Sequence, residues 1–200
     1  MLAKRMLDIV ASLLGLAILA VPMALMAAAI RIESPGRAIF LQRRAGRRGK
    51  PFTMLKFRTM RADVDPYGAS PQGGQDPRLT RLGRFLRETS LDELPQLLNV
   101  LAGQMSLVGP RPLYERQAQQ WDERQRRRLE APPGLTGYAQ VFGRGSLTLE
   151  EKIELDVYYV DNRSFVLDAR ILFKTLALVL GRKEAIYERR YSKDKERESD

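Results

Sequence analysis

A long apolar stretch runs from Met6 to Ile30, and only Asp8, Ser12 and Gly15 interrupt its hydrophobic side chains before a proline near its centre. An unbroken helix of this length can span a bilayer, which requires about 20 residues. The stretch has no small-x-small cleavage site at its proline and continues beyond it, which is not typical of a signal peptide. The pattern therefore predicts a membrane anchor helix over residues 1–33.

The proline of this stretch is Pro22, and it argues against a simple span. Proline removes a helical hydrogen bond and clashes with the preceding turn, so we expect the helix to break near Pro22. Cationic residues flank both ends, and such flanks favour the cytoplasmic side of a membrane. A re-entrant, monotopic helix satisfies both flanks, whereas a kinked transmembrane helix is the alternative. The flanking cations are Lys4, Arg5, Arg31, Arg37, Arg43 and Arg44.

The rest of the chain reads as a mainly α domain of α+β class over residues 34–181. Apolar runs at 38–41 and 52–58 lie on either side of a glycine-containing turn, which predicts a small β-hairpin. Residues 63–77 have the Pro and Gly content of a mobile loop, and residues 182–200 form a charged tail. Helices, some of them interfacial and amphipathic, are expected at Leu79–Arg87, Leu91–Leu101, Pro112–Glu130, Leu149–Val160 and Phe165–Leu180.

Composition restricts the chemistry. The chain has no cysteine and no histidine, which excludes thiolate nucleophiles, Cys/His zinc sites and imidazole bases. Catalysis would have to use carboxylates, Lys, Arg, Tyr or hydroxyl groups. The net charge of +10 favours phosphate-bearing partners, and Mg²⁺ is the metal that suits a phosphate substrate with oxygen ligands.

Two adjacent carboxylates, Asp92 and Glu93, are the first candidates for catalysis. They follow Ser90 at the start of an apolar helical pattern. Ser90 to Glu93 also fits a capping box, in which the serine and the glutamate satisfy free backbone N–H groups at a helix N-terminus. The tetrapeptide alone favours capping, so its context decides.

That context is cationic. Arg111 stands between Pro110 and Pro112, which limit its backbone freedom and present its guanidinium for bidentate phosphate binding. Lys56 and Arg58 alternate with apolar residues and share one face of the predicted hairpin; a solvated surface is the alternative for them and for Arg111. Arginines also precede the acid pair, at Arg81, Arg84 and Arg87.

Six ordered motifs then connect the chain to a known family. Together they resemble the bacterial sugar transferases, the monotopic phosphoglycosyl transferases, and they cover nearly the whole chain. Because the chain is short and starts at its anchor, it resembles the minimal catalytic form. The motifs are Ser34-Pro35-Gly36, Lys56-Phe57-Arg58-Thr59-Met60, Leu91-Asp92-Glu93-Leu94-Pro95-Gln96 with Asn99-Val100, Met105-Ser106-Leu107-Val108-Gly109-Pro110-Arg111-Pro112, Pro133-Gly134-Leu135-Thr136-Gly137 and Asp156-Val157-Tyr158-Tyr159.

The resemblance implies a ping-pong reaction. Asp92 falls on the nucleophile that attacks a UDP-sugar, releases UMP and becomes an aspartyl sugar phosphate. Glu93 falls on its partner, which helps to bind or deprotonate polyprenyl (undecaprenyl) phosphate. The product begins the assembly of a glycoconjugate such as an exopolysaccharide, O-antigen, capsule or glycoprotein glycan.

The resemblance also implies partners and a location. We expect Mg²⁺ at Asp92, substrate phosphate at Arg111, Arg87, Lys56 and Arg58, and membrane lipids around the anchor at the cytoplasmic face of the inner membrane. A homodimer is left open, and the sequence does not identify the sugar. The family breaks its anchor at a Ser-Pro pair, whereas this chain has Val21-Pro22. The candidate nucleotide-side loop contains Gly134, Thr136, Gly137 and Gln140.

A different class of function remains as the alternative. The run Arg124–Arg128 is a basic cluster near Trp121, as in a membrane-anchored module that binds anionic lipid or nucleic acid without catalysis. No nucleic-acid-binding motif accompanies this cluster, so we expect no nucleic-acid partner.

Overall fold

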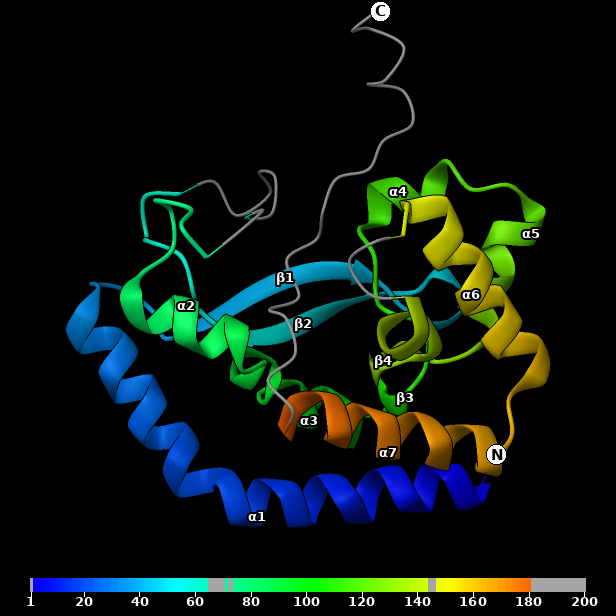
Figure 1. Ribbon diagram of the computed structural model, residues 1–200, viewed down its shortest axis with the longest axis horizontal. Coiled ribbons are helices and arrows are strands. Elements are labelled where there is room, and N and C mark those ends of the chain that lie inside the picture. Colours follow the sequence, from blue (N-terminus) through cyan, green and yellow to red (C-terminus); the bar gives the residue numbers. More distant parts are fainter. Residues whose placement is uncertain (1, 65–70, 72–73, 144–146, 181–200) are drawn as a thin grey trace, which may run out of the picture.

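The computed structural model describes residues 2–64, 71, 74–143 and 147–180, so the charged tail and much of the predicted 63–77 loop lie outside the described residues. It confirms a mainly helical fold with a small antiparallel hairpin (Figure 1). The helices are α1 (Leu2–Glu33), α2 (Arg81–Glu88), α3 (Gln96–Leu101), α4 (Glu115–Gln119), α5 (Glu123–Arg126), α6 (Leu149–Asn162) and α7 (Phe165–Leu180), and the strands are β1 (Ile39–Ala45), β2 (Pro51–Phe57), β3 (Ser106–Val108) and β4 (Gly134–Thr136).

Helix α1 is continuous through Pro22, so the expected break of the helix there is not seen. Figure 1 shows instead that α1 changes direction partway along its length. A kink is the usual result when proline removes one internal hydrogen bond and its neighbours keep theirs. Among the described residues, α1 is the one helix long and apolar enough to cross a membrane.

Polar contacts fasten the N-terminal half of α1 sideways onto the rest of the protein. Asp8, only 4% exposed, accepts hydrogen bonds from the backbone N–H of Leu107 (2.9 Å) and from the hydroxyl of Ser106 (3.1 Å). Lys4 forms an ion pair with Asp168 of α7 at 2.6 Å. This half of α1 therefore lies along the domain and beside α7, as Figure 1 also shows.

Two of the predicted helices are wrong in extent. The helix expected over Pro112–Glu130 is divided into α4, α5 and a 3-10 turn, because Asp122 caps a new helix with a reciprocal hydrogen bond to Gln125. The helix expected over Leu91–Leu101 begins as the 3-10 turn η2 (Leu91–Glu93), and α3 starts only after Pro95. Proline is well suited to such a start, since it has no N–H to leave unsatisfied.

The short parallel pair β3–β4 was not predicted, because three residues give too little alternation to recognise. The pairing joins Ser106 to Gly134 and Val108 to Thr136. A side chain at Gly134 would collide with the backbone N of Gly109, only 2.1 Å from the Cβ position. The glycines of the two motifs thus allow two backbones to meet closely, and this contact positions the Pro-Arg-Pro turn that follows β3.

The docking of α1 gives a first prediction. Replacing Asp8 with Leu removes a buried acceptor and leaves the Leu107 N–H and the Ser106 hydroxyl without it, so the detergent-solubilised protein should lose about 1–3 kcal/mol of stability. The melting temperature of the variant checks this, with Leu14→Ala as the control at an exposed α1 position. An Asp8→Leu protein as stable as the control would show that α1 is not held at this point.

Candidate active site

The two predicted catalytic carboxylates lie on the turn η2 between α2 and α3. The capping box expected as their alternative role is absent, because the Ser90 side chain caps nothing and its backbone is left-handed, with φ of 58°. A non-glycine residue in that conformation carries strain and is common near functional sites. This turn buries Asp92, which is 5% exposed.

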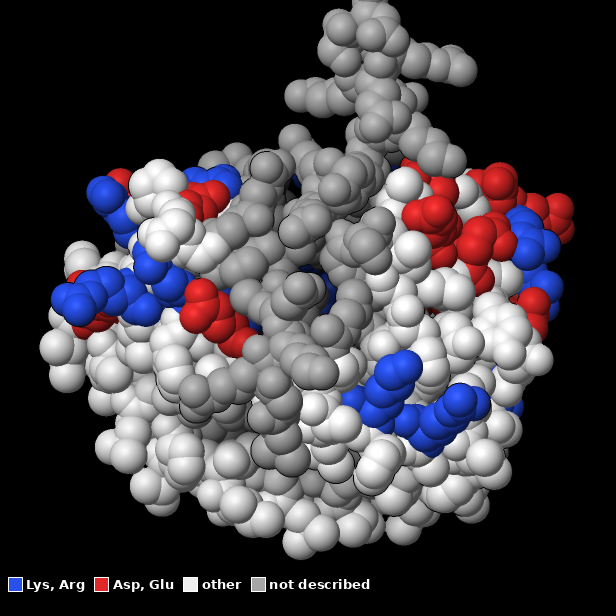
Figure 2. Space-filling view, in the orientation of Figure 1, with Lys and Arg blue, Asp and Glu red and all other residues white. Residues whose placement is uncertain are grey.

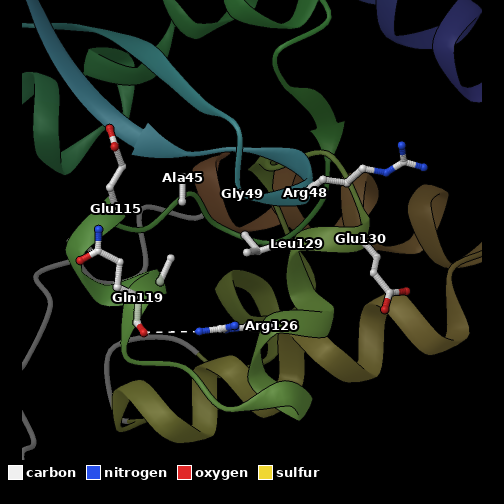
Figure 3. Close-up of a pocket in the computed structure, with 9 residues that line it drawn as sticks. Ala45, Arg48, Gly49, Glu115, Gln119, Arg126, Leu129 and Glu130 are labelled. Carbon is white, nitrogen blue, oxygen red and sulfur yellow. Dashed lines mark hydrogen bonds between the residues drawn. The ribbon is translucent and has the colours of Figure 1, made fainter.

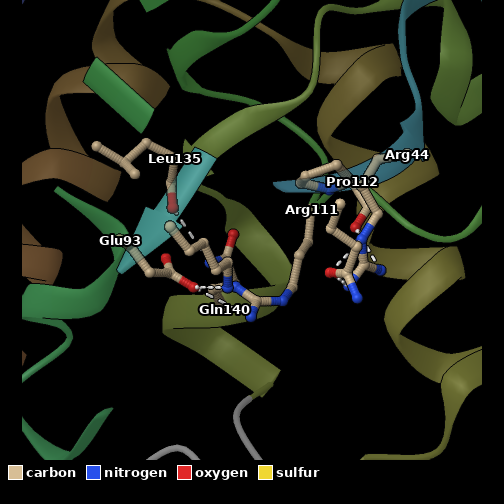
Figure 4. A network of polar contacts seen from close by, with 8 residues as sticks. Arg44, Glu93, Arg111, Pro112, Leu135 and Gln140 are labelled. Atoms are coloured by element: carbon tan, nitrogen blue, oxygen red, sulfur yellow. Dashed lines mark hydrogen bonds and ion pairs between the residues drawn. The ribbon is translucent and has the colours of Figure 1, made fainter. Parts of the chain in front are cut away.

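Glu93 is held by two cations. Its Oε1 accepts hydrogen bonds from Lys56 Nζ of β2 at 2.8 Å and from Arg111 Nη2 at 3.2 Å, and Figure 4 shows the contact with Arg111. Burial alone would raise the pKa of Glu93, but Lys56 and Arg111 outweigh it and lower the pKa to about 2. Glu93 is therefore ionised and fixed in orientation, and the structure brings three predicted site residues together.

Asp92 is in a different state from its neighbour. No described residue donates a hydrogen bond to its carboxylate, and burial raises its pKa to about 6; nearby Lys56 opposes the rise and the charge of Glu93 adds to it. Arg87 is also close enough to lower the pKa of Asp92, and its own Nη1 is buried without a hydrogen-bond partner. A carboxylate without a hydrogen-bond donor and a buried guanidinium nitrogen without an acceptor thus lie within electrostatic reach of each other, which suits a site for a phosphate group.

Two residues that were not predicted as part of the site, Arg128 and Asp156, support the backbone of Arg111. Arg128 donates a hydrogen bond to the backbone carbonyl of Arg111 at 2.7 Å, and it forms an ion pair with Asp156 in which both side chains are buried. The Arg128 guanidinium also stacks over the ring of Trp121 at 4.8 Å. The signal in the sequence was the Asp156-Val157-Tyr158-Tyr159 motif, but nothing there indicated its partner.

Arg58 does not join the other cations. Its guanidinium donates to the carbonyl oxygens of Pro35 (2.6 Å) and Ser34 (2.5 Å), just after the C-terminal end of α1. The prediction that Arg58 binds phosphate is not supported by this placement. Alternation along a strand identified the shared face with Lys56, but Arg58 lies beyond the end of β2, where the chain turns toward α1.

The candidate nucleotide-side loop is divided between two roles. Gly134 and Thr136 belong to β4, and Thr136 shares a hydrogen bond with the Thr175 hydroxyl of α7 at 2.8 Å. Gly137 lies against the backbone of Gly109. Gln140 is the second residue of the π-helical turn η4 (Ala139–Gly143), and Figure 4 shows its side chain beside Glu93 and Arg111. Its Oε1 is buried without a hydrogen-bond partner, so Gln140 can still accept one.

A cavity of about 480 Å³ lies elsewhere, between the tip of the hairpin and α4 and α5 (Figure 3). Neither Asp92 nor Glu93 lines it. The cavity is formed by Ala45, Arg48, Gly49, Glu115, Ala118, Gln119, Arg126, Leu129 and Glu130.

The described residues contain no group of three or more acidic residues that could hold a metal without help. A Mg²⁺ ion commonly binds through one or two carboxylates together with substrate phosphates. Asp92 fits that role better than Glu93, because the Oε1 of Glu93 already faces two cations. The donor set therefore suits a metal that arrives with a phosphorylated substrate.

Comparisons with known proteins show the family of the chain. A family model described as bacterial sugar transferase matches residues 1–182. An uncharacterized sugar transferase, EpsL of Bacillus subtilis, is 46% identical over 90% of this chain and 88% of its own length. UDP-glucose:undecaprenyl-phosphate glucose-1-phosphate transferase of Caulobacter vibrioides is 46% identical over 90% of this chain and 70% of its own.

Other relatives are longer. The UDP-N-acetylgalactosamine-undecaprenyl-phosphate N-acetylgalactosaminephosphotransferase of Aeromonas hydrophila is 38% identical over 88% of this chain, which spans 43% of that protein. The matched part includes the region that forms the acid pair and its cations. The names of these relatives specify different sugars, so sequence identities of 38% to 46% do not identify the sugar that this chain would transfer.

The raised pKa of Asp92 predicts that its charge costs stability. At about pH 8 the Asp92→Asn protein should be more stable than the unmodified protein by up to about 3 kcal/mol, because the variant buries no charge at this position. In the unmodified protein, folded Asp92 takes up its proton near pH 6, whereas the unfolded chain does so only near 3.8. The gain should therefore shrink as the pH falls through this window.

Melting temperatures of both proteins at several pH values measure this effect. Glu93→Gln is the matched control, and it should lower the stability at about pH 8, whereas Asp92→Asn should raise it. The low pKa of Glu93 means that its ion pairs stabilise the fold at neutral pH, and that this stability is lost as the pH falls toward about 2. Equal destabilisation by both substitutions at about pH 8 would contradict the unequal states of the two carboxylates.

Proposed function

This chain belongs to the bacterial sugar transferase family, and on that basis we propose that it transfers a sugar 1-phosphate from a UDP-sugar to polyprenyl phosphate, releasing UMP. Curated relatives carry the names of transferases that act on undecaprenyl phosphate. The product would be a polyprenyl diphosphate sugar, the first membrane-bound intermediate of a glycoconjugate.

Asp92 acts as the nucleophile in this proposal. Its carboxylate oxygen bonds to the β-phosphorus of the UDP-sugar while the bond between that phosphorus and the bridging oxygen breaks, and UMP leaves with the bridging oxygen. A phosphate oxygen of the polyprenyl phosphate then attacks the same phosphorus and releases Asp92. Atoms and charges balance without any oxidant or co-reactant.

The observation that carries the proposal is the unequal state of the two carboxylates. The charge of Glu93 is balanced by ion pairs with Lys56 and Arg111. The carboxylate of Asp92, in contrast, accepts no hydrogen bond from the described residues, and the nearby Arg87 has a buried Nη1 without a hydrogen-bond partner. A carboxylate can approach an anionic diphosphate only where cations offset the repulsion, and three cations lower the pKa of Asp92. Glu93, adjacent and ionised, would act on the acceptor side by orienting the polyprenyl phosphate, since a carboxylate with so low a pKa is a weak base.

Mg²⁺ is part of the proposal, with Asp92 as its protein ligand together with the diphosphate oxygens. When bound, it would neutralise charge on the leaving group. Arg87 and Arg111 bind and orient the phosphates from the protein side. Gln140, next to Arg111 in Figure 4, can accept a hydrogen bond from the UDP-sugar.

We also propose a monotopic arrangement at the cytoplasmic face of the inner membrane. The sideways docking of α1 through Asp8 and Lys4 supports it, because a helix perpendicular to the membrane would carry these contacts and the domain into the lipid. The change of direction of α1 seen in Figure 1 is a second observation in favour of this proposal, because a re-entrant helix must bend within the membrane.

The alternative of a basic binding module is less well supported. Its proposed cluster is not a free basic surface, because Arg128 is buried against Asp156 while Arg124 and Arg127 form ion pairs with Glu154 and Asp161. Phosphate binding there would compete with these acids, and the cluster lies on the α5 side of the molecule.

The direct test is UMP release from a panel of UDP-sugars in detergent with Mg²⁺ and added polyprenyl phosphate. The unmodified protein should release UMP from at least one donor, and Asp92→Asn should release none, because an amide cannot serve as this nucleophile. Glu93→Gln should cripple overall transfer. UMP release by the Asp92→Asn protein at the unmodified rate would refute the assignment.

Arg111→Lys tests the bidentate contact. Lysine keeps the charge but loses the planar fork, so turnover should fall by about 10²-fold or more while the melting temperature changes little. Arg124→Ala is the control for lost charge, since an exposed ion pair of this kind contributes little to stability. If Arg111→Lys kept normal turnover and Arg124→Ala did not, phosphate recognition would belong to the basic cluster.

A further inference from the structure

Helix α7 carries two cations that the proposed reaction does not yet use. Arg170 and Lys174 are four residues apart, so they lie on one side of the helix. Among the residues that the structure describes, neither forms an ion pair. Figure 2 shows a small basic group over α7 whose surroundings are uncharged.

An aromatic cluster positions these cations. Lys174 Nζ lies 3.9 Å from the centre of the Phe142 ring, and the Arg170 guanidinium lies 5.7 Å from it. Phe142 is in turn stacked on Tyr138 at 4.4 Å, and Tyr138 contacts Tyr158 at 5.0 Å. Contacts of cations with aromatic rings limit the freedom of both side chains without neutralising their charge.

The two cations border an apolar surface. Val166 and Phe173 are neighbours of Arg170 on α7, at helical spacings of four and three, and they are 79% and 77% exposed. Helix α1, which is joined to α7 through Lys4 and Asp168, exposes more apolar side chains on its length. These include Leu7, Val10, Leu14, Ile18, Val21 and Leu25. Exposed apolar helices beside cations are typical of a protein surface at the lipid headgroup level.

One member of the aromatic cluster, Phe142, belongs to the turn η4, which also carries Gln140. Phe142 and Gln140 are two residues apart in η4, and the Gln140 side chain lies beside Glu93 and Arg111 in Figure 4. Thr175 of α7, adjacent to Lys174, shares a hydrogen bond with Thr136 of β4 at 2.8 Å. The turn η4 therefore lies between the basic group on α7, which contacts Phe142, and Glu93, which lies beside Gln140 and which we propose to act on the polyprenyl phosphate.

We propose that Arg170 and Lys174 form the entry site for the phosphate of the polyprenyl phosphate acceptor. The acceptor is an amphiphile with an apolar chain and a terminal phosphate monoester, and this surface offers exposed apolar side chains next to two cations. Charge complementarity favours a doubly anionic monoester over the zwitterionic or singly charged headgroups of ordinary phospholipids. This inference rests on the proposed function.

The test separates the two halves of the reaction. An Arg170→Ala/Lys174→Ala protein in detergent should show a KM for polyprenyl phosphate raised about tenfold or more, because charge-assisted contacts are lost. Single-turnover UMP release without acceptor should be unchanged. The charge-preserving Arg170→Lys/Lys174→Arg protein should retain most of the acceptor affinity. Arg43→Ala/Arg124→Ala removes the same charge from exposed ion pairs elsewhere and should leave KM unchanged.

Three results would overturn the inference. An unchanged KM, with normal UMP release, would show that the acceptor does not use this surface. Weaker binding of the double variant to phosphatidylglycerol vesicles at an unchanged KM would assign the surface to membrane phospholipid. Loss of the donor half-reaction would show that α7 only supports the acid pair. Absence of UMP release from the unmodified protein is a different outcome, which would refute the proposed function itself.

Discussion

The ion pairs of Glu93 with Lys56 and Arg111 are the contacts on which the site depends. They fix one carboxylate of an adjacent pair as a permanent anion, and they bring two cations next to the other without a direct bond to it. Asp92 itself is buried, and burial raises its pKa to about 6, while Lys56 and Arg111 oppose the rise and the charge of Glu93 adds to it. The nucleophile that we propose needs a reactive oxygen and cations that offset the repulsion from the substrate, and this difference between Asp92 and Glu93 is the basis of the proposal.

The surrounding fold keeps these contacts in place. Arg111 follows β3, whose pairing with β4 depends on the close approach of Gly109 and Gly134. Its carbonyl is held by Arg128, and the buried pair of Arg128 with Asp156 fixes that arginine to α6. Breaking this buried ion pair would leave an uncompensated charge in the interior, which is costly. Arg128 is therefore held in the position from which it donates to the Arg111 carbonyl. The anchor α1 joins the same framework through Asp8, which binds the start of β3.

The sequence predicted several elements of the fold, whereas the roles of the site residues are still predictions. Hydrophobic periodicity was sufficient for α7 and for the hairpin, because it is visible in short windows. The acid pair was selected by its cationic context and by the family motifs, since its tetrapeptide alone favoured capping. The β3–β4 pair and the Arg128–Asp156 pair depend on residues 28 apart, which no local pattern reveals. Alternation gives a face but not the point at which a strand ends, so the contacts of Arg58 with the chain after α1 were not foreseen. The helix expected over 112–130 is divided by capping at Asp122.

The reaction that we propose requires that Asp92, rather than Glu93, becomes covalently bound to the sugar phosphate. Its most direct measurement is mass spectrometry of the protein after incubation with donor and Mg²⁺ in the absence of acceptor, followed by peptide mapping. We expect a mass increase equal to one sugar phosphate, located on Asp92 and removed on addition of polyprenyl phosphate. An adduct located on Glu93, or UMP release with acceptor present but no adduct at any time, would contradict the account.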